Sequence, residues 1–161
     1  MSAASRLLRQ LHSLLKNPTH GFAVRVLVNE NLLRWQVVIF GPPGTLYEGG
    51  TFLAELQFSL NYPHRPPTVR FLSNVLHPNV YKNGYVCISI LDEPAAGTSE
   101  SAGAAQGLWQ PILTVETIVI SIQSLLSAPN FASPANVDAR TMFCTDPSST
   151  VRSAPVRETI K

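Results

Sequence analysis

Four stretches of the sequence have the composition of β-strands, and each is joined to the next by a short, turn-rich link. They cover residues 23–28, 33–40, 51–59 and 68–72. The third alternates most clearly, with Phe52, Ala54 and Leu56 on one face. Parallel strands need crossover connections of about a dozen residues or more, which these links do not supply. The sequence therefore predicts a four-stranded antiparallel meander.

Helical patterns flank the predicted strands. Residues 2–16 place leucines on one face of a helix. Residues 114–127 carry a wide apolar stripe, which indicates a central buried helix capped by Thr114. Residues 134–144 predict a C-terminal helix, with Ser133 as N-cap and Pro134 at the first helical position. The expected fold class is α+β: an N-terminal helix, the meander, a loop segment, the central helix and a C-terminal helix.

Length and composition fit one globular domain. The chain has 161 residues, of which 45% are hydrophobic and 14% are charged, with a formal net charge of +2. That charge is too small to indicate nucleic acid or a membrane surface as a partner. We expect a core domain over residues 1–147 and a short polar tail over 148–161. No apolar surface stripe is left unexplained by this fold, so we expect a monomer.

The cysteines and histidines do not form a metal-binding or disulfide pattern. The chain has two cysteines, Cys87 and Cys144, and its four histidines show no CxxC or HxxxH spacing with them. The apolar residues near the N-terminus are interrupted by charged and polar ones, unlike those of a signal peptide. We therefore expect free thiols in the cytoplasm, with the nucleus as a second location, and no bound metal.

Cys87 lies in the segment 77–91, which reads HPNVYKNGYVCISIL. Two turns precede the cysteine and apolar residues follow it, so the thiol can be both rigid and reachable. A lone cysteine is also often a small buried apolar residue, and this alternative stays open. His77 could suggest a cysteine–histidine pair, but there is no obvious third group to orient its ring.

Five motifs occur along the chain: Tyr62-Pro63-x-x-Pro66-Pro67, His77-Pro78-Asn79, Cys87 eight positions after Asn79, Trp109-x-Pro111 and Ser133-Pro134-Ala135-Asn136. Read together, they resemble the ubiquitin-conjugating (ubiquitin-carrier) enzymes. The resemblance covers about residues 5–146. Trp109 follows Cys87 by 22 positions. This long insert resembles that of the G-type branch of the family.

The resemblance implies two acyl transfers. Cys87 would accept ubiquitin from the activating enzyme as a thioester, and a lysine amine of a substrate or of ubiquitin would then take it. A ligase usually assists, and the activating enzyme consumes the ATP, so no cofactor is expected. Asn79 is the implied oxyanion donor; its alternative role is to brace its own turn. Two rival functions are an inactive carrier that escorts a partner and a thiol hydrolase.

Other positions are implied by the resemblance as supporting or docking residues. His77, Tyr85, Asp92 and Ser133 would support the active site. Asp92 stands where the branch usually has histidine, and Ser133 stands where many carriers have an acid. Arg6 and Arg9 resemble the basic face that meets the activating enzyme. His64, Pro111 and Ile112 resemble the patch that RING-type ligases grip. Ordinary surface is the alternative for each docking residue.

Overall fold

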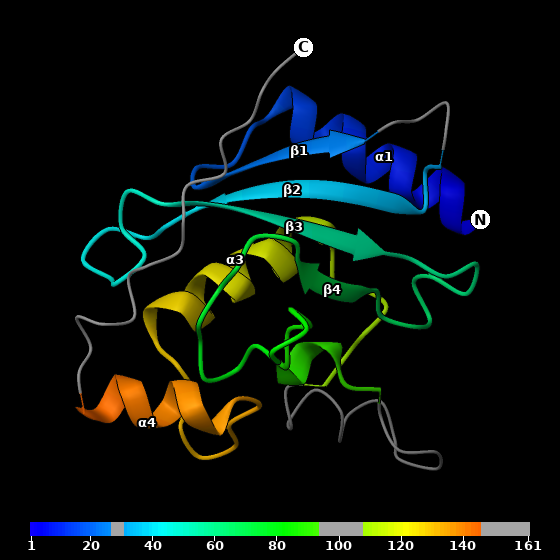
Figure 1. The fold of residues 1–161 in the computed structure, drawn as a ribbon. Coiled ribbons are helices and arrows are strands. Elements are labelled where there is room, and N and C mark those ends of the chain that lie inside the picture. Colours follow the sequence, from blue (N-terminus) through cyan, green and yellow to red (C-terminus); the bar gives the residue numbers. More distant parts are fainter. Residues whose placement is uncertain (27–30, 94–107, 146–161) are drawn as a thin grey trace.

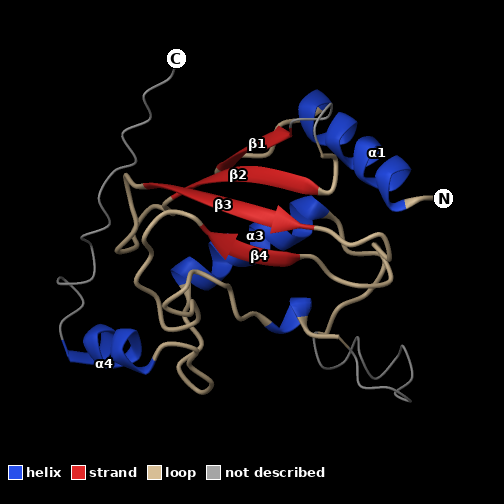
Figure 2. Ribbon diagram, turned by 45° about the vertical axis from the view of Figure 1, so that its right-hand side comes forward, coloured by secondary structure: helices blue, strands red, loops and turns tan. Residues whose placement is uncertain are grey.

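The computed structural model describes residues 1–26, 31–93 and 108–145. The elements, in chain order, are α1 (Ala3–Lys16), β1 (Phe22–Val26), β2 (Arg34–Phe40), β3 (Thr51–Gln57), β4 (Thr68–Phe71), the 3-10 helix η1 (Ser89–Leu91), α3 (Val115–Ser127) and α4 (Val137–Thr145) (Figure 1). Helix α3 lies across one face of the sheet, and α1 and α4 lie at opposite ends of the molecule (Figures 1 and 2). The α+β fold predicted from the sequence is confirmed.

The sheet is an antiparallel meander in the order β1-β2-β3-β4. Val37 of β2 pairs with Val24 of β1 on one side and with Ala54 of β3 on the other. Leu56 of β3 pairs with Val69 of β4. Each strand follows its neighbour directly in the chain, as the short links require.

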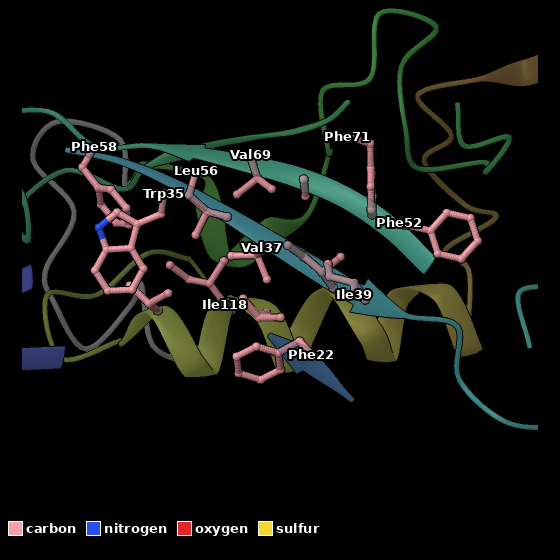
Figure 3. Packing of buried hydrophobic residues seen from close by; sticks show 14 of the residues in the cluster. Phe22, Trp35, Val37, Ile39, Phe52, Leu56, Phe58, Val69, Phe71 and Ile118 are labelled. Atoms are coloured by element: carbon pink, nitrogen blue, oxygen red, sulfur yellow. The ribbon is translucent and has the colours of Figure 1, made fainter. Parts of the chain in front are cut away.

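The hydrophobic core lies between this sheet and α3. Alternate residues of β2, namely Trp35, Val37 and Ile39, are fully buried. Figure 3 shows Val37 opposite Ile118 of α3. Burying every second residue of a strand against a helix is what the period-two alternation of the sequence predicts. All six apolar positions of α3 that form its stripe are buried: Val115, Ile118, Val119, Ile122, Leu125 and Leu126.

Both long helices begin at side-chain caps. The Ser2 side chain accepts a hydrogen bond from the Ser5 N–H at the start of α1. The Thr114 side chain accepts one from the Thr117 N–H at the start of α3. These bonds satisfy N–H groups that have no partner within the first turn of a helix. The predicted cap at Thr114 is confirmed.

The predicted start of the C-terminal helix was wrong. Helix α4 begins at Val137, three residues after Pro134, and Asn136 rather than Ser133 supplies the cap by accepting from the Ala139 N–H (3.1 Å). The N–H groups of Ala135 and Asn136 both donate to the Pro78 carbonyl, at 2.8 and 2.9 Å. If the helix began at Pro134, these two N–H groups would point along its axis. They bond to Pro78 instead, so the helix begins later.

Residues 61–67, the Pro-rich segment, cross from β3 to β4 and pack on Trp109. The Tyr62–Pro63 peptide bond is cis. The Trp109 indole N–H donates to the Pro63 carbonyl (2.8 Å), and Trp109 is 2% exposed. Trp109 therefore belongs to the core, as does Trp35.

Two further findings concern the described ranges alone. Among their helices, none is long and apolar enough to cross a membrane. The same ranges contain no cluster of three or more side chains that could hold a metal ion. The expected tail over residues 148–161 and nearly all of the 92–106 insert lie outside the described residues.

Candidate active site

A tight turn delivers the chain to Cys87. Gly84 has a φ of +91°, a conformation that favours glycine, and a Cβ there would come within 2.3 Å of the Phe71 carbonyl oxygen. The Gly84 N–H donates to the Tyr81 carbonyl (2.8 Å), and the Phe71 N–H donates to the Gly84 carbonyl (2.9 Å). The turn is thus fastened to the end of β4. The 77–91 segment is green in Figure 1 and lies between β4 and α4.

Cys87 is half-buried, and its backbone is anchored while its side chain remains reachable. The Cys87 N–H donates to the Asn79 carbonyl (2.9 Å), and Val80 pairs with Val86 across the same turn. Two residues later η1 begins at Ser89. The arrangement holds a partly exposed thiol on a segment whose main chain is bonded on both sides of the turn.

Both ring nitrogens of His77 are used inside the protein. The Asn79 N–H donates to His77 Nδ1 (2.9 Å), and His77 Nε2 donates to the Leu125 carbonyl of α3 (2.9 Å). His77 is fully buried, and burial lowers its pKa to about 4. The neutral imidazole ties the 77–80 turn to the central helix and has no free nitrogen to offer the thiol.

The Asn79 side chain bridges to the loop before α4. Its Nδ2 donates to the Asn130 carbonyl (2.8 Å), and its Oδ1 accepts from the Asn130 N–H (2.8 Å). A longer contact joins Nδ2 to the Ser133 carbonyl (3.4 Å). Asn79 is 2% exposed. The side-chain amide of Asn79 thus bonds to a distant loop rather than to its own turn. The main-chain carbonyl of Asn79 accepts from the Cys87 N–H.

Tyr81 is a site residue that sequence reasoning missed. The negative charge of the Cys87 thiolate, ahead of that of Asp92, raises the pKa of the Tyr81 phenol. The Cys87 side chain therefore lies close to Tyr81, and Asp92 acts on the phenol more weakly. Tyr81 is 47% exposed, so its ring forms part of the surface beside the thiol. No local pattern marks this residue, because its place beside the thiol results from the turn that ends at Gly84.

Two of the expected support residues lie in other surroundings. The Tyr85 ring lies 5.6 Å from the guanidinium carbon of Arg70, on the side of β4. Arg70 Nε also donates to the Asn83 carbonyl (2.9 Å), so this arginine holds the turn from outside. Ser133 is exposed, and the contact that the structure gives it toward the site is its carbonyl on Asn79.

A groove of about 540 Å³ adjoins Tyr81. It is lined by residues of the 81–83 turn and of the start of α4, namely Tyr81, Lys82, Asn83, Ala135, Asn136, Val137 and Asp138. Lys82 Nζ and a carboxylate oxygen of Asp138 lie 2.6 Å apart, and both side chains are largely exposed. The ion pair links the turn to α4 at the edge of the groove, where water limits its strength.

The expected docking residues are all at least partly exposed. Arg9, His64 and Pro111 are exposed, and Ile112 is 76% exposed. Arg6 is half-buried, and its Nη2 donates to the Pro111 carbonyl (2.6 Å). Arg6 is therefore engaged within the molecule, in contact with the loop that carries Ile112.

The family model described as "Ubiquitin-conjugating enzyme" matches residues 6–156. A half-buried thiol, the buried His77 and Asn79 behind it and the α+β fold agree with that match. The chain belongs to the ubiquitin-conjugating enzyme family and is a transferase of that class. Members of this family work in general with ubiquitin, an activating enzyme and a ligase.

Individual relatives place the chain in the G-type branch. It is 51% identical over 133 residues to ubiquitin-conjugating enzyme E2 13 of Arabidopsis thaliana, covering 83% of this chain and 80% of the relative. It is 52% identical over 139 residues to E2 7 of the same plant, covering 86% and 83%. The solved structure of human ubiquitin-conjugating enzyme E2 G1 is 49% identical, with a TM-score of 0.69, and covers 78% of this chain and 95% of that chain.

Proposed function

We propose that Cys87 is the residue that carries ubiquitin. Its thiolate attacks the thioester on the activating enzyme, a new bond forms between Cys87 Sγ and the C-terminal carbonyl carbon of ubiquitin, and the sulfur of the activating enzyme leaves as a thiolate. A lysine amine then attacks this thioester, an amide forms and Cys87 leaves as the thiol. Sulfur suits both steps because it is a good nucleophile and a good leaving group.

The observation that carries this proposal is the position of the Cys87 sulfur. Its backbone is fixed by the Asn79 carbonyl, yet its side chain is half-buried rather than enclosed. The other cysteine, Cys144, lies exposed on α4. Cys87 is thus a thiol set on a rigid segment, in a chain of a family that conjugates ubiquitin.

Asn79, Tyr81 and Asp92 are proposed to serve the second transfer. Tyr81 lies close to the thiol, and the Asp92 carboxylate is near enough to Tyr81 for its charge to act on the phenol, so it can attract the ammonium group of an approaching lysine. Asn79 keeps the loop at Asn130 in place through both ends of its amide. For Asn79 to donate to an oxyanion as well, its Nδ2 must use its second hydrogen. His77, Tyr85 and Ser133 are proposed as structural support.

The partners proposed here are ubiquitin, its activating enzyme, a RING-type ligase and lysines of protein substrates. The exposed Arg9, together with Arg6, is assigned to the activating enzyme, and His64 and Ile112, with Pro111, are assigned to the ligase. The protein is proposed to act as a monomer with a core over residues 1–147, and its cytoplasmic or nuclear location stays a prediction.

The experiment that tests Cys87 compares it with Cys144. Purified protein is incubated with activating enzyme, ATP and ubiquitin, and the products are separated without reductant. We expect an adduct in the wild type and in Cys144→Ala that dithiothreitol removes, and none in Cys87→Ala. An adduct that resists dithiothreitol, or that survives in Cys87→Ala, would overturn the proposal.

The same preparation separates the two rival functions. An inactive carrier would form no adduct at all. A thiol hydrolase would lose ubiquitin to water without an added amine, at least as fast as to free lysine. The proposed transferase should hold the thioester in water and release it when lysine is added.

The role of Asn79 is tested by replacing it with alanine and with aspartate. Asn79→Ala leaves the Asn130 N–H and carbonyl without partners, which costs about 1–3 kcal/mol of stability. Asn79→Asp keeps the acceptor and loses the donor. We expect both to slow transfer to lysine, with Asn79→Ala also lowering the urea midpoint. Unchanged stability in Asn79→Ala would contradict the bracing role.

A further inference from the structure

Helix α1 is fastened to two loops by hydrogen bonds from Arg6 and Gln10. Arg6 Nη2 donates to the Pro111 carbonyl (2.6 Å), and the Arg6 Nε atom is itself buried. Gln10 Nε2 donates to the Tyr62 hydroxyl oxygen (3.0 Å), and Gln10 Oε1 accepts from the Val115 N–H (2.9 Å). Two neighbouring side chains of α1 therefore hold both the Pro-rich segment and the start of α3.

The loop between Trp109 and Val115 is bonded at each end and in the middle. Trp109 donates from its indole to the Pro63 carbonyl, Pro111 accepts from Arg6, and Val115 donates to Gln10. The Val115 N–H belongs to the first turn of α3, where the helix supplies no partner for it. The bond from Arg6 is charge-assisted and is the stronger kind. Ile112, in the centre of this loop, remains 76% exposed.

We propose that Arg6 and Gln10 are positioning residues for ligase docking: they hold residues 109–115 so that Ile112 is presented in one fixed arrangement. The inference deepens the proposed function, on which it rests, because it concerns the patch assigned to a RING-type ligase. It also separates Arg6 from Arg9, whose exposed side chain has no hydrogen bond to any described residue.

The expected effect is on ligase affinity rather than on the chemistry at Cys87. A loop that is ordered before binding loses less conformational freedom when the partner docks. Removing one such hydrogen bond should raise the half-saturating ligase concentration by about five-fold, the equivalent of about 1 kcal/mol. The Cys87 backbone is bonded to Asn79, and the segment around it is bonded to α3 and to the loop before α4. None of these bonds involves Arg6 or Gln10, so the maximal rate of discharge to lysine should not change.

The test titrates an isolated RING domain into protein charged with ubiquitin and follows discharge to free lysine. The RING domain is chosen from a panel because it stimulates the wild type. We expect Arg6→Gln, which removes one hydrogen bond, to need about five-fold more RING for half-maximal stimulation, and Gln10→Leu, which removes two, to need more than that. Both should reach the wild-type maximal rate at saturation. Lys16→Gln, which removes a positive charge from the exposed end of the same helix, should match the wild type.

A second readout follows the loop without any partner. The methyl carbon of Ile112, labelled selectively, should change its chemical shift in Gln10→Leu and Arg6→Gln and not in Lys16→Gln. If Gln10→Leu melts below the assay temperature, Arg6→Gln carries the test alone, since it removes the bond to the Pro111 carbonyl and leaves both Gln10 contacts in place.

The outcomes show separately whether the proposed function fails or only the positioning role of Arg6 and Gln10. Absence of a reductant-sensitive adduct in the wild type would sink the proposed function, and a panel with no stimulating RING domain would sink its ligase assignment and this inference together. A charged, stimulated wild type whose half-saturating RING concentration is unchanged by Gln10→Leu would overturn the positioning role alone. A fall in the maximal rate without a change in half-saturation would also overturn it.

Discussion

Both ring nitrogens of His77 are bonded to backbone groups, so neither is free to act on the Cys87 thiol. Its ring lies fully buried between the Asn79 N–H and the Leu125 carbonyl. Burial opposes the charged form, and the hydrogen bond to Leu125 only partly offsets this effect. The imidazole is therefore neutral at pH 7 and acts as a fixed hydrogen-bonding block behind the cysteine segment.

The lowered pKa of His77 predicts a loss of stability in mild acid. Its folded value of about 4 lies below the ordinary 6.5, so between these values the unfolded chain binds a proton that the folded chain does not. The free energy of unfolding should fall as the pH drops through this window, by on the order of 3 kcal/mol in all. Urea unfolding at pH 7 and at pH 4.5 measures most of the difference.

The matched variant for this prediction is His77→Gln. Glutamine can still donate to the Leu125 carbonyl but does not titrate. We expect His77→Gln to be less stable than the wild type at pH 7, because its shape differs, and to lose less stability on acidification. Equal pH dependence in the two proteins would show that His77 is not the group responsible.

At the scale of elements, the turn at residues 81–84 decides where the thiol stands. Gly84 has a positive φ and no room for a Cβ, since one would lie 2.3 Å from the Phe71 carbonyl oxygen. Gly44 also has a positive φ of +71°, but a Cβ there would meet nothing within 4 Å. Alanine would introduce backbone strain at either position, but it would also introduce a steric clash only at Gly84.

This comparison gives a prediction for Gly84→Ala and Gly44→Ala. Strain alone costs about 1–2 kcal/mol, which is our expectation for Gly44→Ala. The Gly84→Ala variant should lose more stability than that, because β4 or the turn must also move, and should form the Cys87 thioester more slowly. Urea midpoints and single-turnover loading rates measure both effects. Equal losses in the two variants would argue against the clash at Phe71.

The elements also show what could be predicted from the sequence. The strands and α3 were predictable because burial of one face imposes a regular spacing of apolar residues. In β2 every second residue is buried, as at Trp35 and Val37, and in α3 the buried residues recur at helical spacing, as at Ile118 and Ile122. The start of α4 was not. Ser133 and Asn136 are both good N-cap residues, and the choice depends on backbone amides bonding to Pro78, more than fifty positions earlier.

The candidate site divides in the same way. Cys87 and the motif at His77 and Asn79 were recognisable as a pattern of residue types. The position of Tyr81 beside the thiol was not, because it results from the turn at Gly84 and not from spacing. The bond between Asn79 and Asn130 joins loops far apart in the chain, and no local pattern predicts such a partner.

At the scale of the whole molecule, the described part of the chain ties the segment around Cys87 to the hydrophobic core. His77 is bonded to Leu125 of α3, and Asn79 is bonded to the loop that follows the same helix. Helix α3 in turn packs on the sheet through Ile118, which lies opposite Val37 (Figure 3). The segment around Cys87 should therefore unfold together with the sheet and not before it.

Two isoleucines of α3 test this cooperativity. Ile118 is fully buried, whereas Ile120, on the outer face of the same helix, is 43% exposed. Ile118→Ala should lower the free energy of unfolding by about 2–5 kcal/mol, because it removes buried methyl groups and leaves a cavity. Ile120→Ala, at a partly exposed position, should cost clearly less. In each variant, the urea midpoint from tryptophan fluorescence should coincide with the midpoint for loss of thioester formation on Cys87. Loss of thioester formation at a lower urea concentration than unfolding of the sheet would mean that the active-site segment is an independent unit, held more weakly than its bonds to α3 imply.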